Sequence, residues 1–226
     1  MTSISMRTYG EAPEEVGTYD VDFTQLCHYL YLPIFMSDLA DDIRLPRRLE
    51  PFREIVDAAI DDFCEQTRPG NRGRYIYLTV HRGYATPGYP LNRPGWHADG
   101  FGTDDINYIW CDAFPTRFAL HDFGPISDDH AVSLAQFADR ARATHVYPPK
   151  TLLKLDPFVI HDVPDIPAPG GMRTFAKVSF SDQRYNLVGN SHNYDFDYDW
   201  PMHERSVVRN DPAFAGADFG PQQNQD

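Results

Sequence analysis

Apolar residues recur at helical spacing between Pro51 and Gln66. They follow the pattern i, i+3, i+4, i+7, which places them on one face of a helix. These residues are Phe52, Ile55, Val56, Ala59, Ile60 and Phe63. A Pro-Gly-Asn turn at 69–71 ends the pattern. The segment therefore predicts a helix that packs one face against another element, which we expect to be a sheet.

The period then changes to that of strands, because residues 74–81 are rich in aromatic and β-branched side chains. Further strands are expected at 105–111, 116–121, 144–147, 151–155, 157–162 and 172–181. A second helix is expected at about 129–142, with Ser127 or Asp128 as its N-cap. Many short strands with few helices predict a mainly β fold, a sandwich or barrel-like core with flanking helices.

Three segments interrupt this pattern. Residues 1–20 show little periodicity and are expected to form a loose arm, and Pro33 prevents a helix over 23–39. The loop 83–95 is rich in proline and glycine, and long loops of this kind often cover or form a site. At 194–200 aromatic residues alternate with Asp, which indicates an edge strand or, alternatively, a lid or dimer contact.

No linker or internal repeat divides the chain, so residues 1–210 are interpreted as one catalytic domain. It comprises an N-terminal helical part at about 22–66 and a β core at about 74–200, while residues 211–226 are expected to be a disordered tail.

The composition limits the class of protein. The 226 residues carry 20 Lys and Arg against 33 Asp and Glu, a net charge of −13, which argues against nucleic acid as a partner. No stretch has the length of apolar sequence that a membrane span needs, and no secretory signal is visible. The three cysteines are widely spaced and odd in number, so we expect reduced thiols in a cytoplasmic protein.

The candidate chemistry lies in the sequence His97-Ala98-Asp99. In an extended segment, residues i and i+2 point to the same side, so this imidazole and carboxylate converge. His161 ends an apolar strand-like segment later in the chain, and a second histidine would complete a facial triad of two histidines and one carboxylate. Arg173 follows twelve residues later and shares a strand face with Phe175, Lys177 and Ser179. HxD alone is a weak signal, since composition predicts about one in a chain of this length.

The order of HxD, a distant His and then an Arg resembles the Fe(II)/2-oxoglutarate-dependent dioxygenase superfamily. The resemblance covers about residues 74–181 and rests on four positions. It implies a double-stranded β-helix core (jelly-roll, cupin-like), with His97, Asp99 and His161 as ligands of Fe(II). It also implies that Arg173 binds the distal carboxylate of 2-oxoglutarate.

One position departs from the family. Phe175 stands where many members place a Ser or Thr that assists the same carboxylate, and Lys177 takes part in cosubstrate binding or replaces Arg173.

The resemblance implies an oxidoreductase, a hydroxylase that uses Fe(II), 2-oxoglutarate and O₂ on an unidentified small-molecule substrate. It indicates no catalytic residue beyond the metal ligands and no substrate-binding residue, with the loop 83–95 and the segment 194–200 as candidate covers. Two alternatives stay open. One is a jelly-roll binding or structural protein in which HxD is accidental. The other is a cupin-like metal enzyme that does not use 2-oxoglutarate and does not need Arg173.

Overall fold

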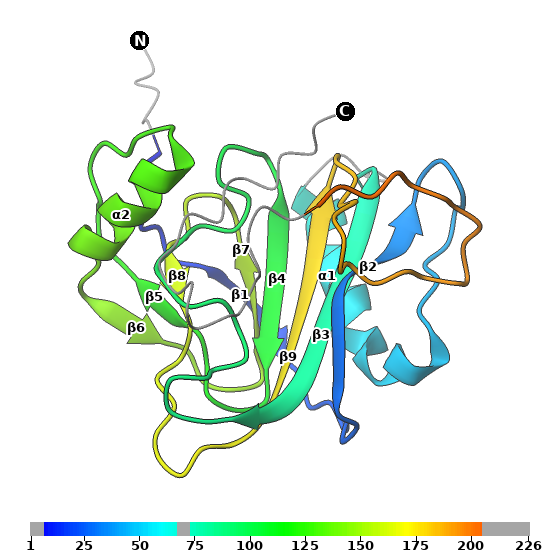
Figure 1. The fold of residues 1–226 in the computed structure, drawn as a ribbon, viewed down its shortest axis with the longest axis horizontal. Coiled ribbons are helices and arrows are strands. Elements are labelled where there is room, and N and C mark those ends of the chain that lie inside the picture. Colours follow the sequence, from blue (N-terminus) through cyan, green and yellow to red (C-terminus); the bar gives the residue numbers. More distant parts are fainter. Residues whose placement is uncertain (1–6, 67–72, 205–226) are drawn as a thin grey trace.

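The computed structural model describes residues 7–66 and 73–204. Within them the fold is mainly antiparallel β structure with two α-helices (Figure 1). A sheet of six strands has the order β1-β7-β4-β9-β3-β2. In chain order its strands are β1 (Glu14–Thr18), β2 (Cys27–Met36), β3 (Tyr75–Ala85), β4 (Ile106–Cys111), β7 (Thr151–Leu155) and β9 (Gly171–Ser181).

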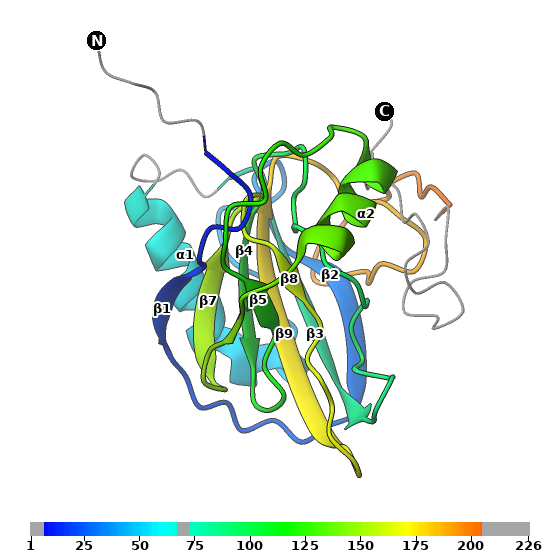
Figure 2. The same cartoon turned by 90° about the vertical axis from the view of Figure 1, so that its left-hand side faces the viewer.

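A second, smaller sheet has the order β6-β5-β8. Its strands are β5 (Arg117–Ala119), β6 (Thr144–Val146) and β8 (His161–Asp162). Figure 2 shows this sheet and helix α2 (His130–Arg140) on the side turned toward the viewer, in front of the large sheet. The chain segments between the two sheets carry the side chains that form the candidate site.

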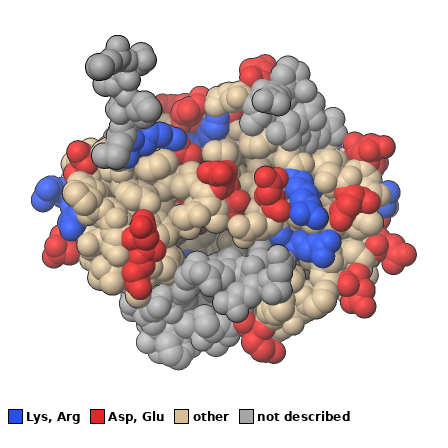
Figure 3. All heavy atoms as spheres, turned by 90° about the horizontal axis from the view of Figure 1, so that it is seen from above, with Lys and Arg blue, Asp and Glu red and all other residues tan. Residues whose placement is uncertain are grey.

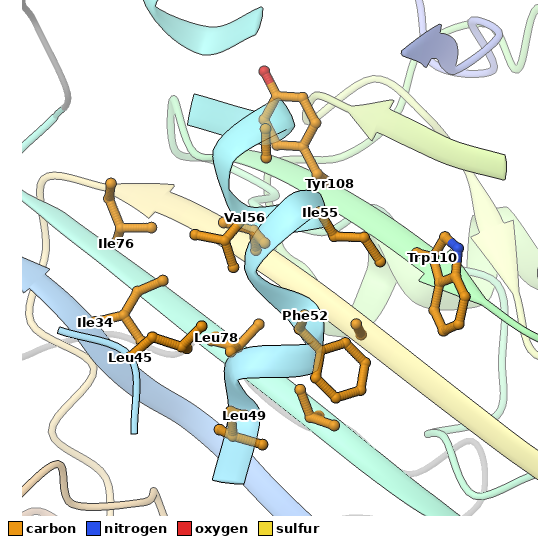
Figure 4. Close-up of a cluster of buried hydrophobic side chains, with 14 of the residues drawn as sticks. Ile34, Leu45, Leu49, Phe52, Ile55, Val56, Ile76, Leu78, Tyr108 and Trp110 are labelled. Carbon is orange, nitrogen blue, oxygen red and sulfur yellow. The ribbon is translucent and has the colours of Figure 1, made fainter. Parts of the chain in front are cut away.

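Helix α1 (Arg53–Gln66) covers the outer face of the large sheet (Figure 4). A short 3-10 helix, η1 (Arg47–Phe52), leads directly into it. The apolar stripe that the sequence predicts is buried here, and Phe52 packs edge-on against Trp110 of β4 at a centroid distance of 6.4 Å. Helix α1 therefore covers one face of the large sheet, and the opposite face is the one that lines the candidate site.

The strands of the large sheet alternate between these two faces, as the period of two requires. On β3, Ile76 and Leu78 pack against α1, whereas Thr79 and His81 lie on the opposite face. In register with them on β9, Val178 belongs to the core under α1 and Lys177 to the opposite face. The side away from α1 is therefore polar at its centre, although it is largely buried.

The structure confirms most of the predicted elements and corrects several. The strand predicted at 157–162 is reduced to the two residues of β8, and the N-cap of α2 is Asp129, whose side chain accepts a hydrogen bond from the Val132 amide at 2.9 Å. The segment 1–20 contains strand β1, which pairs with β7. The N-terminal part at 22–66 is not helical throughout, because 27–36 forms strand β2, which pairs with β3, and the helices begin only at Arg47.

The interpretation of 194–200 as an edge strand is wrong, because this segment contains no strand and makes a turn at 194–195. Phe196 is buried among tyrosines of β2 and β3, but Tyr194 is 90% exposed, so the alternation does not produce two uniform faces. The tail at 211–226 lies outside the described residues.

The face seen in Figure 3 carries acidic side chains spread over most of its described area, with basic side chains in a few smaller groups. This distribution agrees with the net charge of −13 and presents no broad basic patch on this face. Among the described residues, no helix is long and apolar enough to cross a membrane.

Candidate metal centre

The two candidate histidine ligands lie side by side on short extended segments. His97 and His161 form an isolated antiparallel bridge, in which the amide of each donates to the carbonyl of the other at 3.0 Å. Their imidazole rings lie 4.4 Å apart between centroids. Asp99 follows two residues after His97, so its carboxylate points to the same side as the imidazole.

The ligand atoms of His97, Asp99 and His161 all lie within 4.8 Å of one another. The Nε2 atom of His97 is 3.8 Å from Oδ1 of Asp99, and the Nε2 atom of His161 is 3.8 Å from Oδ2. Within the described part of the chain, these three side chains form a cluster that could hold a metal ion, and they are the ligands that the sequence predicts.

The hydrogen bonds of the two rings set their tautomers. Nδ1 of His97 lies 2.7 Å from the carbonyl oxygen of Gly95, and Nδ1 of His161 lies 3.4 Å from that of Val159. A carbonyl only accepts, so each Nδ1 carries the proton. Each Nε2 therefore presents a lone pair toward Asp99, which is the arrangement that metal-binding histidines adopt.

The protonation states of the three candidate ligands favour metal binding. Burial, together with the neighbouring His161, lowers the pKa of His97 to about 3, and burial also lowers the pKa of His161. Burial alone would raise the pKa of Asp99. The positive charge of Lys177 and the two imidazoles lower it by more than this, so the pKa of Asp99 lies well below its usual range. At neutral pH the cluster is two neutral imidazoles and one carboxylate, the protonation state in which these groups bind a cation.

Asp162 connects the two ligand-bearing segments. Its Oδ1 accepts hydrogen bonds from the amides of Gly95 and Val163 at 2.8 and 2.7 Å, and its Oδ2 accepts from Arg117 at 2.6 Å. Gly95 also supplies the carbonyl that orients His97. A single buried carboxylate thus attaches the 95–97 segment to the strand that carries His161.

Lys177 extends from β9 to the other side of Asp99. Its Nζ atom lies 2.9 Å from Oδ2 of Asp99 and 3.4 Å from the hydroxyl of Tyr31. Tyr31 has a φ of 47°, in the left-handed region, at an irregularity in the pairing of β2 with β3. Such strain in a non-glycine residue often marks a functional site. Here it accompanies a tyrosine ring that lies 5.0 Å from the Lys177 Nζ.

Arg173 is fully buried at the start of β9, four residues before Lys177. Its Nε donates to the Phe114 carbonyl at 3.0 Å, and Nη1 donates to Oδ1 of Asn92. Nη2 is buried without a hydrogen-bond partner among the described residues. Burial lowers the pKa of Arg173, although nearby Cys111 and Asp112 raise it.

A cavity of about 100 Å³ surrounds the cluster. It is lined by the three candidate ligands and Lys177, together with Ile109 and Phe175 from the large sheet, and Thr116. Asn92 and Arg93 also line it, so the loop 83–95 forms part of the cavity wall. Arg173 is not part of this lining and is separated from it by Asn92 and Phe175, which contact its guanidinium.

Three residues of this site were missed by reasoning from the sequence. Asp162 stands directly after His161, and Asn92 lies in the proline- and glycine-rich loop 83–95. Their places next to a candidate ligand and in a candidate cover were the signals that could have indicated them. No signal in the sequence indicated Tyr31, because its place depends on an irregular strand pairing.

No family model and no curated protein matches this chain. Among solved structures, a full-length Neurospora crassa protein in complex with alpha-KG has 10% identity, a TM-score of 0.38, and coverage of 65% of this chain and 49% of that one. EvdO2 from Micromonospora carbonacea var. aurantiaca has 14% identity, a TM-score of 0.35 and coverage of 59% of each chain. A bsmA homolog from Methylobium petroleophilum PM1 has 18% identity, a TM-score of 0.35, and coverage of 71% and 65%.

This chain therefore spans between about half and two thirds of the length of these structures. TM-scores this low do not establish a shared fold or function. The proposed function therefore depends on the geometry of the metal centre.

Proposed function

We propose that this protein is a non-haem Fe(II) oxygenase that couples decarboxylation of 2-oxoglutarate to hydroxylation of a small molecule. The observation that carries the proposal is the cluster of His97, Asp99 and His161, whose ligand atoms lie within 4.8 Å. The proposal treats residues 1–210 as a single catalytic domain.

The order of the strands supports a double-stranded β-helix core. In the large sheet, β9 lies between β3 and β4, and β7 follows β4. In the small sheet β5 lies between β6 and β8, and the bridge of His97 to His161 adds a further segment beside β8. Two antiparallel sheets of this kind are a feature of jelly-roll folds, and this supports the proposed core.

The donor set fits Fe(II). Two imidazoles and one carboxylate that converge from one side form the facial arrangement of non-haem iron oxygenases, which leaves the remaining positions open. Both imidazoles are neutral and held in the Nε2-donor tautomer by backbone carbonyls. Bound iron supplies the oxidising chemistry, in which 2-oxoglutarate and O₂ are consumed and a C–H bond of the substrate is hydroxylated.

Two cations on β9 suit the two ends of a dicarboxylate. Arg173 and Lys177 are four residues apart, which is roughly 13 Å along an extended strand, and they contact different groups. The unpartnered Nη2 of Arg173 suits the distal carboxylate, and Lys177 adds a positive charge at the metal end.

The remaining residues of the site position the ligands and exclude water. Asp162 holds the His97 segment in place, while Ile109 and Phe175 give the cavity apolar walls. A dry cavity strengthens the electrostatic interactions within it and limits side reactions.

A second function is favoured by one observation, the position of Arg173 outside the cavity lining. If Asn92 and Phe175 keep the guanidinium covered, the site would be a cupin-like metal enzyme that does not use 2-oxoglutarate.

An anaerobic titration with Fe(II) and then 2-oxoglutarate tests these functions. We expect a visible metal-to-ligand charge-transfer band that is lost in His97→Ala and weakened in Arg173→Ala. Iron binding without the band would support the cupin-like alternative. Failure of the folded protein to bind iron would leave a jelly-roll binding or structural protein.

A further inference from the structure

A second and larger cavity adjoins the metal centre. It has a volume of about 540 Å³, within the range of small-molecule sites. It shares three lining residues with the metal cavity, namely His28, His81 and Asn92. The two cavities are therefore neighbours with a common wall. The metal cavity, at about 100 Å³, does not have room for both 2-oxoglutarate and a substrate.

The outer wall of the larger cavity comes from the loop after β3. Thr86 and Tyr89 exchange backbone hydrogen bonds at 3.2 and 2.8 Å, so this part of the loop is a closed turn. Leu91 then folds back over β3 with a φ of 71°, and a Cβ on Gly83 would lie 3.2 Å from its Cδ1. Glycine at 83 thus allows the loop to approach the strand closely.

The two histidines that line this cavity are neutral, and its one arginine is paired. Burial lowers the pKa of His81 to about 3, and it also lowers the pKa of His28. Nε2 of His81 lies 3.1 Å from Oδ1 of Asn92, an acceptor, so this ring is a neutral imidazole with its proton on Nε2. The Arg82 guanidinium donates to Asp112 at 3.0 Å, which balances its charge.

The other lining groups are mainly apolar, and flat rings form the common wall. The apolar lining groups from the loop are Tyr89, Pro90, Leu91 and Pro94. The His81 ring stacks on the rings of Phe175 and His28, with centroid distances of 5.0 and 5.7 Å and interplanar angles of 25° and 17°. A charged ligand would lose its hydration in this mainly apolar lining. The one guanidinium in the lining, Arg82, already has its charge balanced by Asp112 and keeps only its Nε without a hydrogen-bond partner among the described residues. A flat uncharged ring would instead bury apolar area.

We propose that this cavity, between the start of β2, the end of β3 and the loop 86–94, is the substrate-binding compartment, and that it binds an uncharged, mainly apolar aromatic molecule. The role as substrate compartment rests on the proposed function, whereas the binding of such a molecule does not. The shared wall at His28, His81 and Asn92 places the bound molecule next to the metal centre.

Three probes with one ring system and different charge test the class of ligand. The full chain without metal is titrated with 2-naphthol, 2-naphthoate and 2-naphthylmethylammonium, and binding is followed by ligand-observed NMR. We expect 2-naphthol to bind at least about ten times more tightly than either charged analogue. Equal or tighter binding of a charged analogue, or no binding of 2-naphthol, would overturn the proposal.

The location is tested by filling the cavity. We expect Leu91→Trp to abolish 2-naphthol binding, whereas Leu39→Trp, at an exposed position outside the cavity lining, leaves it unchanged. Because Leu91→Trp can also disturb the loop, intermolecular NOEs from 2-naphthol to the Leu91 methyl groups of the unaltered chain provide a second measurement. Their absence in the bound complex would refute this location.

Proximity to the metal centre is tested with Mn(II), which broadens the proton signals of a molecule bound nearby. We expect Mn(II) to broaden bound 2-naphthol, and His161→Ala to remove this broadening but not the binding. Bound 2-naphthol that stays sharp while Mn(II) occupies the cluster would refute the role as substrate compartment. Failure of Mn(II) to bind would count against the proposed metal centre, and the metal-free titration decides the ligand class independently.

Discussion

His97 and His161 exchange both of their backbone hydrogen bonds, although they are 64 residues apart in the chain. Each histidine is thereby placed by the backbone of the other. This bridge is isolated, so the adjoining residues have to hold the two segments in register. Asp162 is well placed to do so, because it accepts from the Gly95 amide and lies next to His161.

We expect Asp162→Ala to weaken metal binding by about 10- to 100-fold, the usual cost of losing a residue that supports metal ligands. The Gly95 amide would lose its acceptor, and the 95–97 segment would move away from His161. Co(II) affinity measured by competition with a chelator checks this prediction. Asp165→Ala is the control, since Asp165 also pairs with Arg117 at 2.8 Å but is exposed. Equal effects of the two variants would contradict the role of Asp162.

Lys177 is expected to oppose metal binding and to favour binding of an anionic cosubstrate. Two unit charges 4 Å apart at an effective dielectric constant of 20 interact by about 4 kcal/mol, so an ammonium ion beside a divalent cation costs considerable binding energy. Lys177 also forms an ion pair with Asp99, in which its Nζ lies 2.9 Å from Oδ2, and a bound metal would compete for this carboxylate.

Lys177→Met should therefore raise Mn(II) affinity by at least about tenfold and lower the affinity of the metal-loaded protein for 2-oxoglutarate. Both are measured by calorimetry. Lys154→Met is a matched control, because Lys154 is equally buried on a strand of the same sheet but pairs with Asp62. Changes of the same sign in both affinities would refute this interpretation of Lys177.

Local pattern was sufficient to predict the elements whose burial is regular. The stripe around Phe52 and Ile55 predicts α1, and the mixture of aromatic and β-branched residues predicts β3, because their packing follows the helical and strand periods. Strand β1 was missed because its sequence, Glu-Glu-Val-Gly-Thr, is polar, and what makes it a strand is pairing with β7. Tertiary pairing of this kind leaves no local pattern.

The candidate site shows the same limit. The spacing of His97 and Asp99 predicts that they converge, and His161 was predicted from its place at the end of an apolar segment. The contact of Lys177 with Asp99 depends on the register of β9 with its neighbours and on the loop that carries Asp99. Neither is encoded within a few residues, so the sequence indicated a charged face but not its partner.

The stability of the protein should depend strongly on Phe52 in the core under α1. This side chain is fully buried and contacts the rings of Phe23 and Trp110. We expect Phe52→Ala to lower the free energy of unfolding by about 3 to 5 kcal/mol, because it removes apolar contacts and leaves a cavity. Urea unfolding followed by tryptophan fluorescence measures the change. Leu39→Ala, at a position that is 45% exposed, should change stability little. A loss below about 1 kcal/mol in Phe52→Ala would indicate that this core repacks.

Stability should fall as the pH is lowered from 6.5 toward 3, and His81 should cause part of this fall. Burial, together with the nearby Arg173, lowers the pKa of His81 to about 3 in the folded protein. In the unfolded chain the pKa is about 6.5. Between these values the unfolded state binds a proton that the folded state does not, so each pH unit costs about 1.4 kcal/mol of stability for this one group. Above pH 6.5 neither state is protonated, and the contribution is complete.

In His81→Phe the ring that stacks on Phe175 is kept but the titrating group is removed. We therefore expect the free energy of unfolding of this variant to depend less steeply on pH, by about 1.4 kcal/mol per unit between pH 6 and 4. Urea titrations at four pH values in this range measure the slope. His145→Phe on the exposed strand β6 is the control, because its ring is in contact with solvent in both states. If His81→Phe keeps the slope of the unaltered protein, the His81 imidazole must already be accessible to protons in the folded state.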